Sequence, residues 1–298
     1  MKSNVYLQGA GKNATIFTPL NSIVAEGLEF FICDVGSSYW GLSDFSCDLT
    51  DPPTLVPYTT QDGFSLFLGP GHVSFSNLFM NNGGGFAIRG STVSWNNTTK
   101  ELTTDAQNIH ISRCYCDGAL GSMSFQNVRD LWFEDNILLN WHDDFILTSQ
   151  CGQKHHYLNN LFDGQNNTAG GGNSSGVIFL QNDGGLTTDI NGIRDIHIRG
   201  NTMRRFHLGL AAGEAGVSIS NAKDIWIKEN IIEECGDGIN NNGGNPIEGL
   251  HLIDNIIRNN GKRGISLSFG GTSFLKHSSI NDNKIYNNDQ YGGNNYGA

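Results

Sequence analysis

A short pattern of apolar and polar positions recurs along the chain in the form apolar-x-apolar-x-x-Asn-x-apolar. Its clearest copies are LWFEDNIL (131–138), IHIRGNTM (196–203), IWIKENII (225–232) and LHLIDNII (250–257), and weaker copies begin at Val73, Ile109, His155 and Ser278. The marker slot then holds Leu78, Cys114, Asn136, Asn160, Asn201, Asn230, Asn255 and Asn283. Most intervals between markers are 22 to 29 residues, and two longer intervals, of 36 and 41 residues, indicate inserted loops.

A second short strand lies between successive markers. Its copies are DFILTS (144–149), GVIFLQ (176–181), DGINNN (237–242) and GISLSF (264–269). Strands of about five residues with period-two alternation leave no room for a helix, so each repeat is predicted to be one coil of a β-solenoid. The leucine-rich alternative lacks its regularly spaced Leu. We therefore predict an all-β chain, a single domain spanning 1–298, folded as a single-stranded right-handed parallel β-helix of roughly ten coils that rise about 4.8 Å each.

A slot shared by every coil must fall on one line along the solenoid. We therefore expect one corner stack from Asn136, Asn201, Asn230 and Asn255. Asn tolerates the left-handed backbone of a sharp corner, and stacked amides hydrogen-bond from coil to coil. Ile198, Ile227 and Leu252 each lie three residues before a marker, on strands in which apolar and polar residues alternate. The pattern predicts that they form one inward-facing stack.

The N-terminal end of the solenoid has no evident cap. Solenoids need capped ends, yet the strand pattern NVYLQGAG already begins at Asn4. Two alternatives stay open: an N-terminal cap has been cut off, or another chain covers the open edge. The second alternative predicts a homo-oligomer through the uncapped N-terminal coil.

Composition and charge limit the classes of binding partner that are expected. The 29 Asp and Glu outnumber the 18 Lys and Arg, giving a net charge of −11, so no nucleic acid is expected as a partner on bulk charge. No stretch approaches the roughly 18 to 20 apolar residues of a membrane span, so no membrane partner is expected either. The six cysteines form no CxxC pair, and no metal cluster is predicted from them.

Three segments resemble known β-helix families. KSNVYLQGAGKNATIF (2–17) and GLSDFSCDLTD (41–51) resemble the opening coils of mannuronan epimerase catalytic modules and of pectate-lyase-like proteins. The Asp-Pro-His-Glu motif of those epimerases has no counterpart in GALGSMSFQNVRDLWF (118–133). FEDNILLNWHDDFILTS (133–149) is similar to the polygalacturonase coil in which paired aspartates precede a strand. The resemblance implies the pectate-lyase-like superfamily, a polysaccharide substrate, and an extracellular or cell-surface location.

The candidate catalytic residues are Asp143, Asp144, His142 and Asp117. Successive strand residues point to opposite faces, so at most one of the two adjacent aspartates projects into a groove and the other serves the turn. Carboxylates on stacked coils lie about 5 Å apart per coil step, which can leave one protonated and one ionised for acid–base glycoside cleavage. Asp183, from a neighbouring coil, is expected to line the substrate site. The alternative reading makes these aspartates turn-formers.

A second set of residues suits chemistry on a uronic acid. Epimerisation or β-elimination needs a group to neutralise the carboxylate, a base and an acid. Arg89, Arg204, Arg205 and His207 are of suitable types, and the last three belong to the basic cluster of an acidic chain. The alternative is that this cluster is a solvated outer strand balancing nearby acids.

The sequence also offers a candidate sugar-stacking residue, Trp132, and a candidate Ca²⁺ site. Trp132 lies between two apolar residues on an alternating strand, so it is predicted to face outward, where it would stack on a sugar ring. Hard oxygen ligands from Asp143, Asp144 and a neighbouring carboxylate would suit Ca²⁺. The predicted chemistry requires no cofactor.

Two Gly- and Asn-rich loops, 165–175 and 182–195, flank the coil next to Asp143 and Asp144, and such loops commonly wall a binding groove. The sequence therefore predicts a carbohydrate-active enzyme, a lyase, an epimerase or a glycoside hydrolase, acting on an extended and uronic-acid-containing polysaccharide. The alternative is a non-catalytic glycan-binding or adhesin-type solenoid that presents the small polar side chains of strands such as DGINNN and GISLSF.

Overall fold

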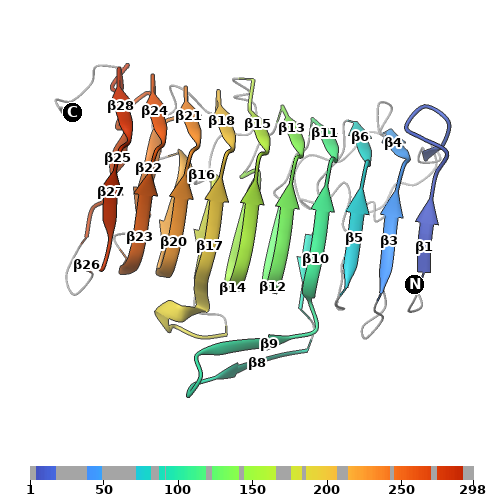
Figure 1. Ribbon diagram of the computed structural model, residues 1–298, viewed down its shortest axis with the longest axis horizontal. Coiled ribbons are helices and arrows are strands. Elements are labelled where there is room, and N and C mark those ends of the chain that lie inside the picture. The colour runs from blue at the N-terminus through green and yellow to red at the C-terminus, as the bar shows by residue number, and fades with distance from the viewer. Residues whose placement is uncertain are drawn as a thin grey trace, which may run out of the picture.

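The structure is a computed structural model that describes residues 5–17, 39–48, 72–81, 87–90, 92–118, 123–140, 144–165, 176–182, 186–206, 214–241, 245–269 and 274–290. These residues form a right-handed parallel β-helix, which confirms the predicted fold class. Its coils lie side by side from β1 at one end to β28 at the other (Figure 1). Each complete coil runs along a first, a second and a third face in chain order.

The third face is a sheet of ten parallel strands, which sets the count at ten coils for the described residues. It consists of β2 (Ile16–Phe17), β4 (Ser46–Asp48), β6 (Phe79–Asn81), β11 (Tyr115–Asp117), β13 (Ile137–Leu139), β15 (Leu161–Asp163), β18 (Thr202–Arg204), β21 (Ile231–Glu233), β24 (Ile256–Arg258) and β28 (Lys284–Tyr286).

The first and second faces belong to one larger sheet, because β12 (Met123–Glu134) and β14 (Ile146–Leu158) bend from one face onto the other. The second face continues with β1 (Val5–Gln8), β3 (Trp40–Ser43), β5 (Val73–Ser76), β10 (Gln107–Ser112), β17 (Ile193–Arg199), β20 (Ala222–Lys228), β23 (Ile247–Ile253), β26 (Leu275–Lys276) and β27 (Ser279–Asn281). The first face continues with β7 (Ala87–Arg89), β16 (Gly176–Gln181), β19 (Ala215–Ser220), β22 (Asp237–Asn241) and β25 (Ile265–Ser266).

The corner between the first and second faces carries an external brace. The antiparallel hairpin of β8 (Val93–Asn96) and β9 (Glu101–Thr104) projects there beside the short helix η1 (Ile190–Gly192) (Figure 1). Lys100 pairs with Asp189 at 2.6 Å, and the buried Gln153 accepts a hydrogen bond from the backbone N–H of Leu102 at 3.0 Å. These contacts fix both insertions to the solenoid.

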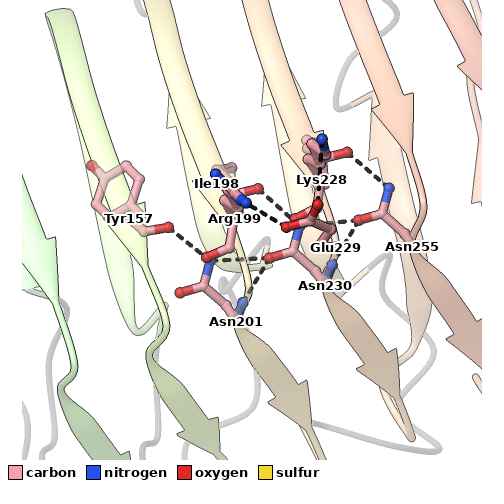
Figure 2. Close-up of polar contacts among 9 residues, drawn as sticks. Tyr157, Ile198, Arg199, Asn201, Lys228, Glu229, Asn230 and Asn255 are labelled. Carbon is pink, nitrogen blue, oxygen red and sulfur yellow. Dashed lines mark hydrogen bonds and ion pairs between the residues drawn. The ribbon is translucent and has the colours of Figure 1, made fainter.

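The marker asparagines form the predicted ladder at the corner between the second and third faces. The backbone N–H of Asn201 donates to Oδ1 of Asn230 at 2.9 Å, and that of Asn230 donates to Oδ1 of Asn255 at 3.0 Å (Figure 2). Each Nδ2 also donates to a carbonyl of the preceding coil, as from Asn230 to Ile198 at 2.8 Å. The ladder begins at Cys114, whose N–H donates to Asn136, and it reaches Asn283.

A second, shorter ladder lies at the corner between the third and first faces. The N–H of Cys235 donates to Oδ1 of Asn260, and the N–H of Asn260 donates to Oδ1 of Asn288. The repeat pattern did not predict this ladder, because only the last coils carry it.

The solenoid interior is filled by stacked apolar side chains. Ile198, Ile227 and Leu252 are aligned on neighbouring strands and are fully buried, which confirms the predicted inward stack. Trimming Ile227 to Ala should lower the free energy of unfolding by roughly 2 to 5 kcal/mol, because a cavity would replace close packing. Urea denaturation measures this difference, and a loss below about half a kcal/mol would place Ile227 at a surface.

One polar network interrupts this interior. His155 and Tyr157 of β14 are fully buried, and Nε2 of His155 donates to the carbonyl of Val128 at 2.9 Å. Nδ1 must then accept from the Tyr157 hydroxyl at 3.1 Å, which in turn accepts from Thr148 at 2.8 Å. Burial lowers the pKa of His155 from 6.5 to about 4, so the imidazole is neutral at pH 7.

This neutral imidazole predicts acid-sensitive stability. Because the pKa is lower in the folded chain, the unfolded chain binds more protons below pH 6.5, so the stabilisation is complete above pH 6.5 and is lost toward about pH 4. Between pH 7 and 5 the free energy of unfolding should fall by about 2 kcal/mol through His155.

Urea titrations at several pH values measure this slope. His155→Gln should flatten this slope, because it removes the buried imidazole whose pKa is lowered in the folded chain. An unaltered slope in His155→Gln would assign the acid sensitivity to other groups.

Candidate functional site

One strand of the first face, β16, has a long connection at each end. Residues 164–175 separate β15 from β16, and residues 182–192 separate β16 from β17. Both connections therefore belong to the same coil. The sequence predicted a groove walled by these two loops, and the fold brings their attachment points to opposite ends of β16.

The outward side chains of the first face are mostly small and polar. One row aligns Ser124, Leu147, Phe179, Ser218, Asn240 and Ser266. Ser218 in this row is fully buried and Asn240 is 8% exposed. The middle of this row is therefore covered, whereas Ser124 and Ser266 towards its ends are half-exposed.

Arg89 faces outward from the same surface. It pairs in register with Gln126, and the row continues through Ser149, Gln181 and Ser220. The side chain is exposed at the end of β7. Arg89 thus lies where a cation would meet an anionic chain on the first face, and its predicted role in substrate binding remains a prediction.

Four of the predicted site residues, Asp143, His142, Asp183 and His207, lie outside the described residues. Their proposed roles therefore remain predictions.

Asp144 holds the corner between the third and first faces. Its side chain is 5% exposed, and Oδ1 accepts a hydrogen bond from the backbone N–H of Gly176 on the next coil at 2.9 Å. Asp237, further along the same corner, repeats this contact by accepting from the N–H of Arg263 at 3.1 Å. The same residue type making the same bond on two coils favours the turn-forming alternative for Asp144.

Glu214 is a candidate that the sequence analysis did not single out. It directly precedes β19, as Asp143 directly precedes Asp144, and Gly176 of the coil between them is in register with Ala215. Glu214 is 2% exposed, and its backbone carbonyl accepts from the N–H of Asp237 at 2.8 Å. An acidic residue just before an apolar strand at this corner was the available signal.

Arg204 and Arg205 are engaged with a carboxylate of their own chain. Nε of Arg204 donates to Asp163 at 2.9 Å, and Nε of Arg205 donates to the other oxygen at 2.7 Å. Although burial raises it, hydrogen bonds from Arg205 and Gln165 keep the pKa of Asp163 below its usual range. The geometry favours the charge-balancing alternative over a substrate site for these two arginines.

Asp117 lies on the third face, at the end of β11. Its carboxylate accepts from the hydroxyl of Tyr115 at 3.2 Å and from Nδ2 of Asn140 at 2.8 Å. Burial and the charge of Asp117 raise the pKa of Tyr115. Asp117 is thus partnered within its own face, and its predicted catalytic role remains untested.

Trp132 faces outward as predicted and is 43% exposed, but its ring takes part in a stack. In register along the second face lie His110, Trp132, His156, His197, Trp226 and His251. The rings of Trp132 and His156 stack at 4.1 Å, and those of Trp226 and His251 at 4.0 Å. The His156 ring covers one face of the Trp132 ring, and the expected sugar stacking on Trp132 remains a prediction.

The described ranges contain no group of three or more His, Cys, Asp or Glu placed to hold a metal ion. They contain no helix with the length and hydropathy of a membrane span. The predicted Ca²⁺ site involves Asp143 and remains a prediction.

Comparison with solved structures identifies the architecture. The A-module of mannuronan C-5 epimerase AlgE6 from Azotobacter vinelandii superposes with a TM-score of 0.56 at 13% identity, covering 97% of this chain and 73% of that module. The chain has the parallel β-helix fold of this module.

Two further structures match less well. The AlgE4 A-module of the same organism gives a TM-score of 0.45 at 15% identity over 96% of this chain and 80% of that one. Bacteriophage phi29 gene product 12 gives a TM-score of 0.30 at 14% identity, covering 94% of this chain and 51% of that chain. No protein-family model matches the sequence, and no curated protein sequence matches it.

Proposed function

We propose that this protein is an enzyme that cleaves or modifies an extended, uronic-acid-containing polysaccharide along its first face. The observation that carries the proposal is the outward row of Arg89, Gln126, Ser149, Gln181 and Ser220 on the first face, where β16 has a long connection at each end. The fold shared with a mannuronan epimerase module supports a polyuronate substrate. An extracellular or cell-surface location accords with such a substrate.

The acid–base residues of the proposal are Asp143 and Glu214. Asp143 directly precedes Asp144 in the sequence, and Glu214 directly precedes β19 at the corner where Asp144 and Asp237 use their carboxylates to join coils. A carboxylate can abstract the proton beside a uronate carboxyl group, or can act as acid or base in glycoside cleavage. Arg89 would neutralise the substrate carboxylate, which lowers the cost of the developing charge.

The test is incubation with alginate, pectin and a neutral glycan under three readouts. Absorbance of unsaturated products reports a lyase, new reducing ends without that absorbance report a hydrolase, and a changed ratio of epimers by NMR reports an epimerase. The proposal expects one of these signals on an acidic polysaccharide. Activity on neutral glycans alone, or on none of the three, would contradict it.

A further inference from the structure

A cavity of about 480 Å³ opens at the N-terminal end of the solenoid, at the corner between the second and third faces. It is lined by Gly11, Lys12, Asp44, Asn77, Leu78, Phe79, Arg113 and Tyr115. The loop between β1 and β2 contributes Gly11 and Lys12, and three further coils contribute the rest. Of the three corners, this is the one that does not border the first face.

Two cations face this cavity without a carboxylate partner among the described residues. Nζ of Lys12 lies 5.1 Å from the ring centroid of Phe79, and Nε of Arg113 donates to Oδ1 of Asn77 at 3.1 Å. Elsewhere in the described chain many basic side chains are paired, as Arg204 is with Asp163. Two cations without an ion-pair partner among the described residues therefore line one cavity of a chain whose net charge is −11.

Asp44 forms no direct hydrogen bond or ion pair with these cations, although its charge attracts Arg113 through space. Its carboxylate accepts hydrogen bonds from Ser43 at 2.8 Å, Gln8 at 3.0 Å and Asn77 at 3.0 Å, and these bonds lower its pKa. Asn77 thereby links Asp44 to Nε of Arg113. The guanidinium is held through Nε, while its two terminal nitrogens make no hydrogen bond to described residues and remain available to a ligand.

The wall of the cavity suits a sugar ring. The rings of Phe79 and Tyr115 stack at 4.5 Å and offer an apolar surface, and the Tyr115 hydroxyl provides a polar edge beside Asp117. A planar guanidinium binds a carboxylate through two parallel hydrogen bonds, and the Lys12 ammonium adds a second charge. The combination of paired cations with aromatic surface matches a sugar that carries a carboxylate.

We infer that this cavity binds one uronic acid unit of a polysaccharide, with its carboxylate on Arg113 and Lys12 and its ring beside Phe79 and Tyr115. It is an anchoring site separate from the first face, and only its choice of polysaccharide rests on the proposed function. A long chain held at this corner would keep the protein on its substrate between reactions.

Calorimetric titration with a uronate tetrasaccharide tests the inference, beside the same tetrasaccharide with its carboxyl groups reduced to alcohols and beside inorganic phosphate. Arg113→Gln should weaken one class of site at least about tenfold, since it removes charge-assisted hydrogen bonds. Gln suits position 113, where φ is positive, because Gln150 and Gln165 adopt the same backbone conformation. Lys12→Gln combined with Arg113→Gln should abolish this class of site.

Arg258→Gln is the matched control, because Arg258 lies on the same third face but pairs with Glu233. It should leave this class of site unchanged. Equal binding by the carboxyl-reduced sugar, phosphate binding as tight as that of the tetrasaccharide, or unchanged binding in Arg113→Gln would overturn the inference. If the unmodified protein shows this binding but no activity on any glycan of the panel, only the proposed function is rejected.

Discussion

Asp143→Asn and Glu214→Gln should each lower kcat/KM on the best polysaccharide substrate by about a hundredfold or more. The amides keep the size of the side chains but cannot exchange a proton, so the loss would report acid–base chemistry. Thermal unfolding should stay close to that of the unmodified protein. Steady-state kinetics on the substrate found in the glycan panel, with melting curves beside them, measure both quantities.

The matched variants are Asp144→Asn and Asp237→Asn. Both residues accept a backbone hydrogen bond from the next coil, so each substitution should cost about 1 kcal/mol of stability and leave turnover per folded molecule near normal. A loss of turnover in Asp144→Asn but not in Asp237→Asn would return Asp144 to the catalytic role suggested by the sequence. Near-normal activity in both Asp143→Asn and Glu214→Gln would reject this corner as the reaction site.

Asn160→Asp should be the most destabilising of the substitutions considered, with a loss of about 5 kcal/mol or more. Nδ2 of Asn160 donates to the carbonyl of Phe133 and to Oδ1 of Asn201, both at 2.9 Å, and the side chain is 2% exposed. A carboxylate cannot donate these bonds. It would also place a charge beside two oxygens away from water, which is a further cost.

The adjacent residue supplies the control for this substitution. Asn159 is exposed at the same corner with a φ of 55°, a conformation that Asp also adopts there at Asp135 and Asp254. Asn159→Asp should therefore change stability by less than about half a kcal/mol. Urea denaturation of the two variants gives the comparison, and similar losses in both would mean that the Asn ladder contributes little to the fold.

Periodic features of the fold were predictable because each repeats the same physical requirement. Asn201 and Asn230 occupy one slot in every coil, and the sharp corner needs both a left-handed neighbour and an amide that bonds across coils. Ile198 and Ile227 follow the alternation that separates interior from surface on a strand. The sequence therefore predicted the coils, the corner ladder and the inward stack.

Features that depend on one coil's neighbours were not predictable. Arg205 looks like a substrate ligand until the fold brings Asp163, 42 positions earlier, against its guanidinium. Trp132 faces outward as alternation requires, but register with His156 on the next coil decides that its ring is stacked. Glu214 carries no motif of its own, and only the register of Ala215 with Gly176 places it at the corner that Asp144 occupies.

The cavity around Arg113 shows the same limit. Its lining comes from four consecutive coils, the first of which contributes only its β1–β2 loop, and it lies at marker slots where the repeat is weakest. Asn77 and Asp44 have no shared motif, and only their placement in three dimensions joins them to Arg113.

The most direct test of the polysaccharide-enzyme assignment is a time course of ¹H NMR spectra on a polyuronate incubated with the protein. The account predicts anomeric or unsaturated-sugar signals that grow with time and with protein concentration, and that do not grow with the Asp143→Asn, Glu214→Gln double variant. A polyuronate spectrum that stays unchanged with folded, unmodified protein would contradict the account.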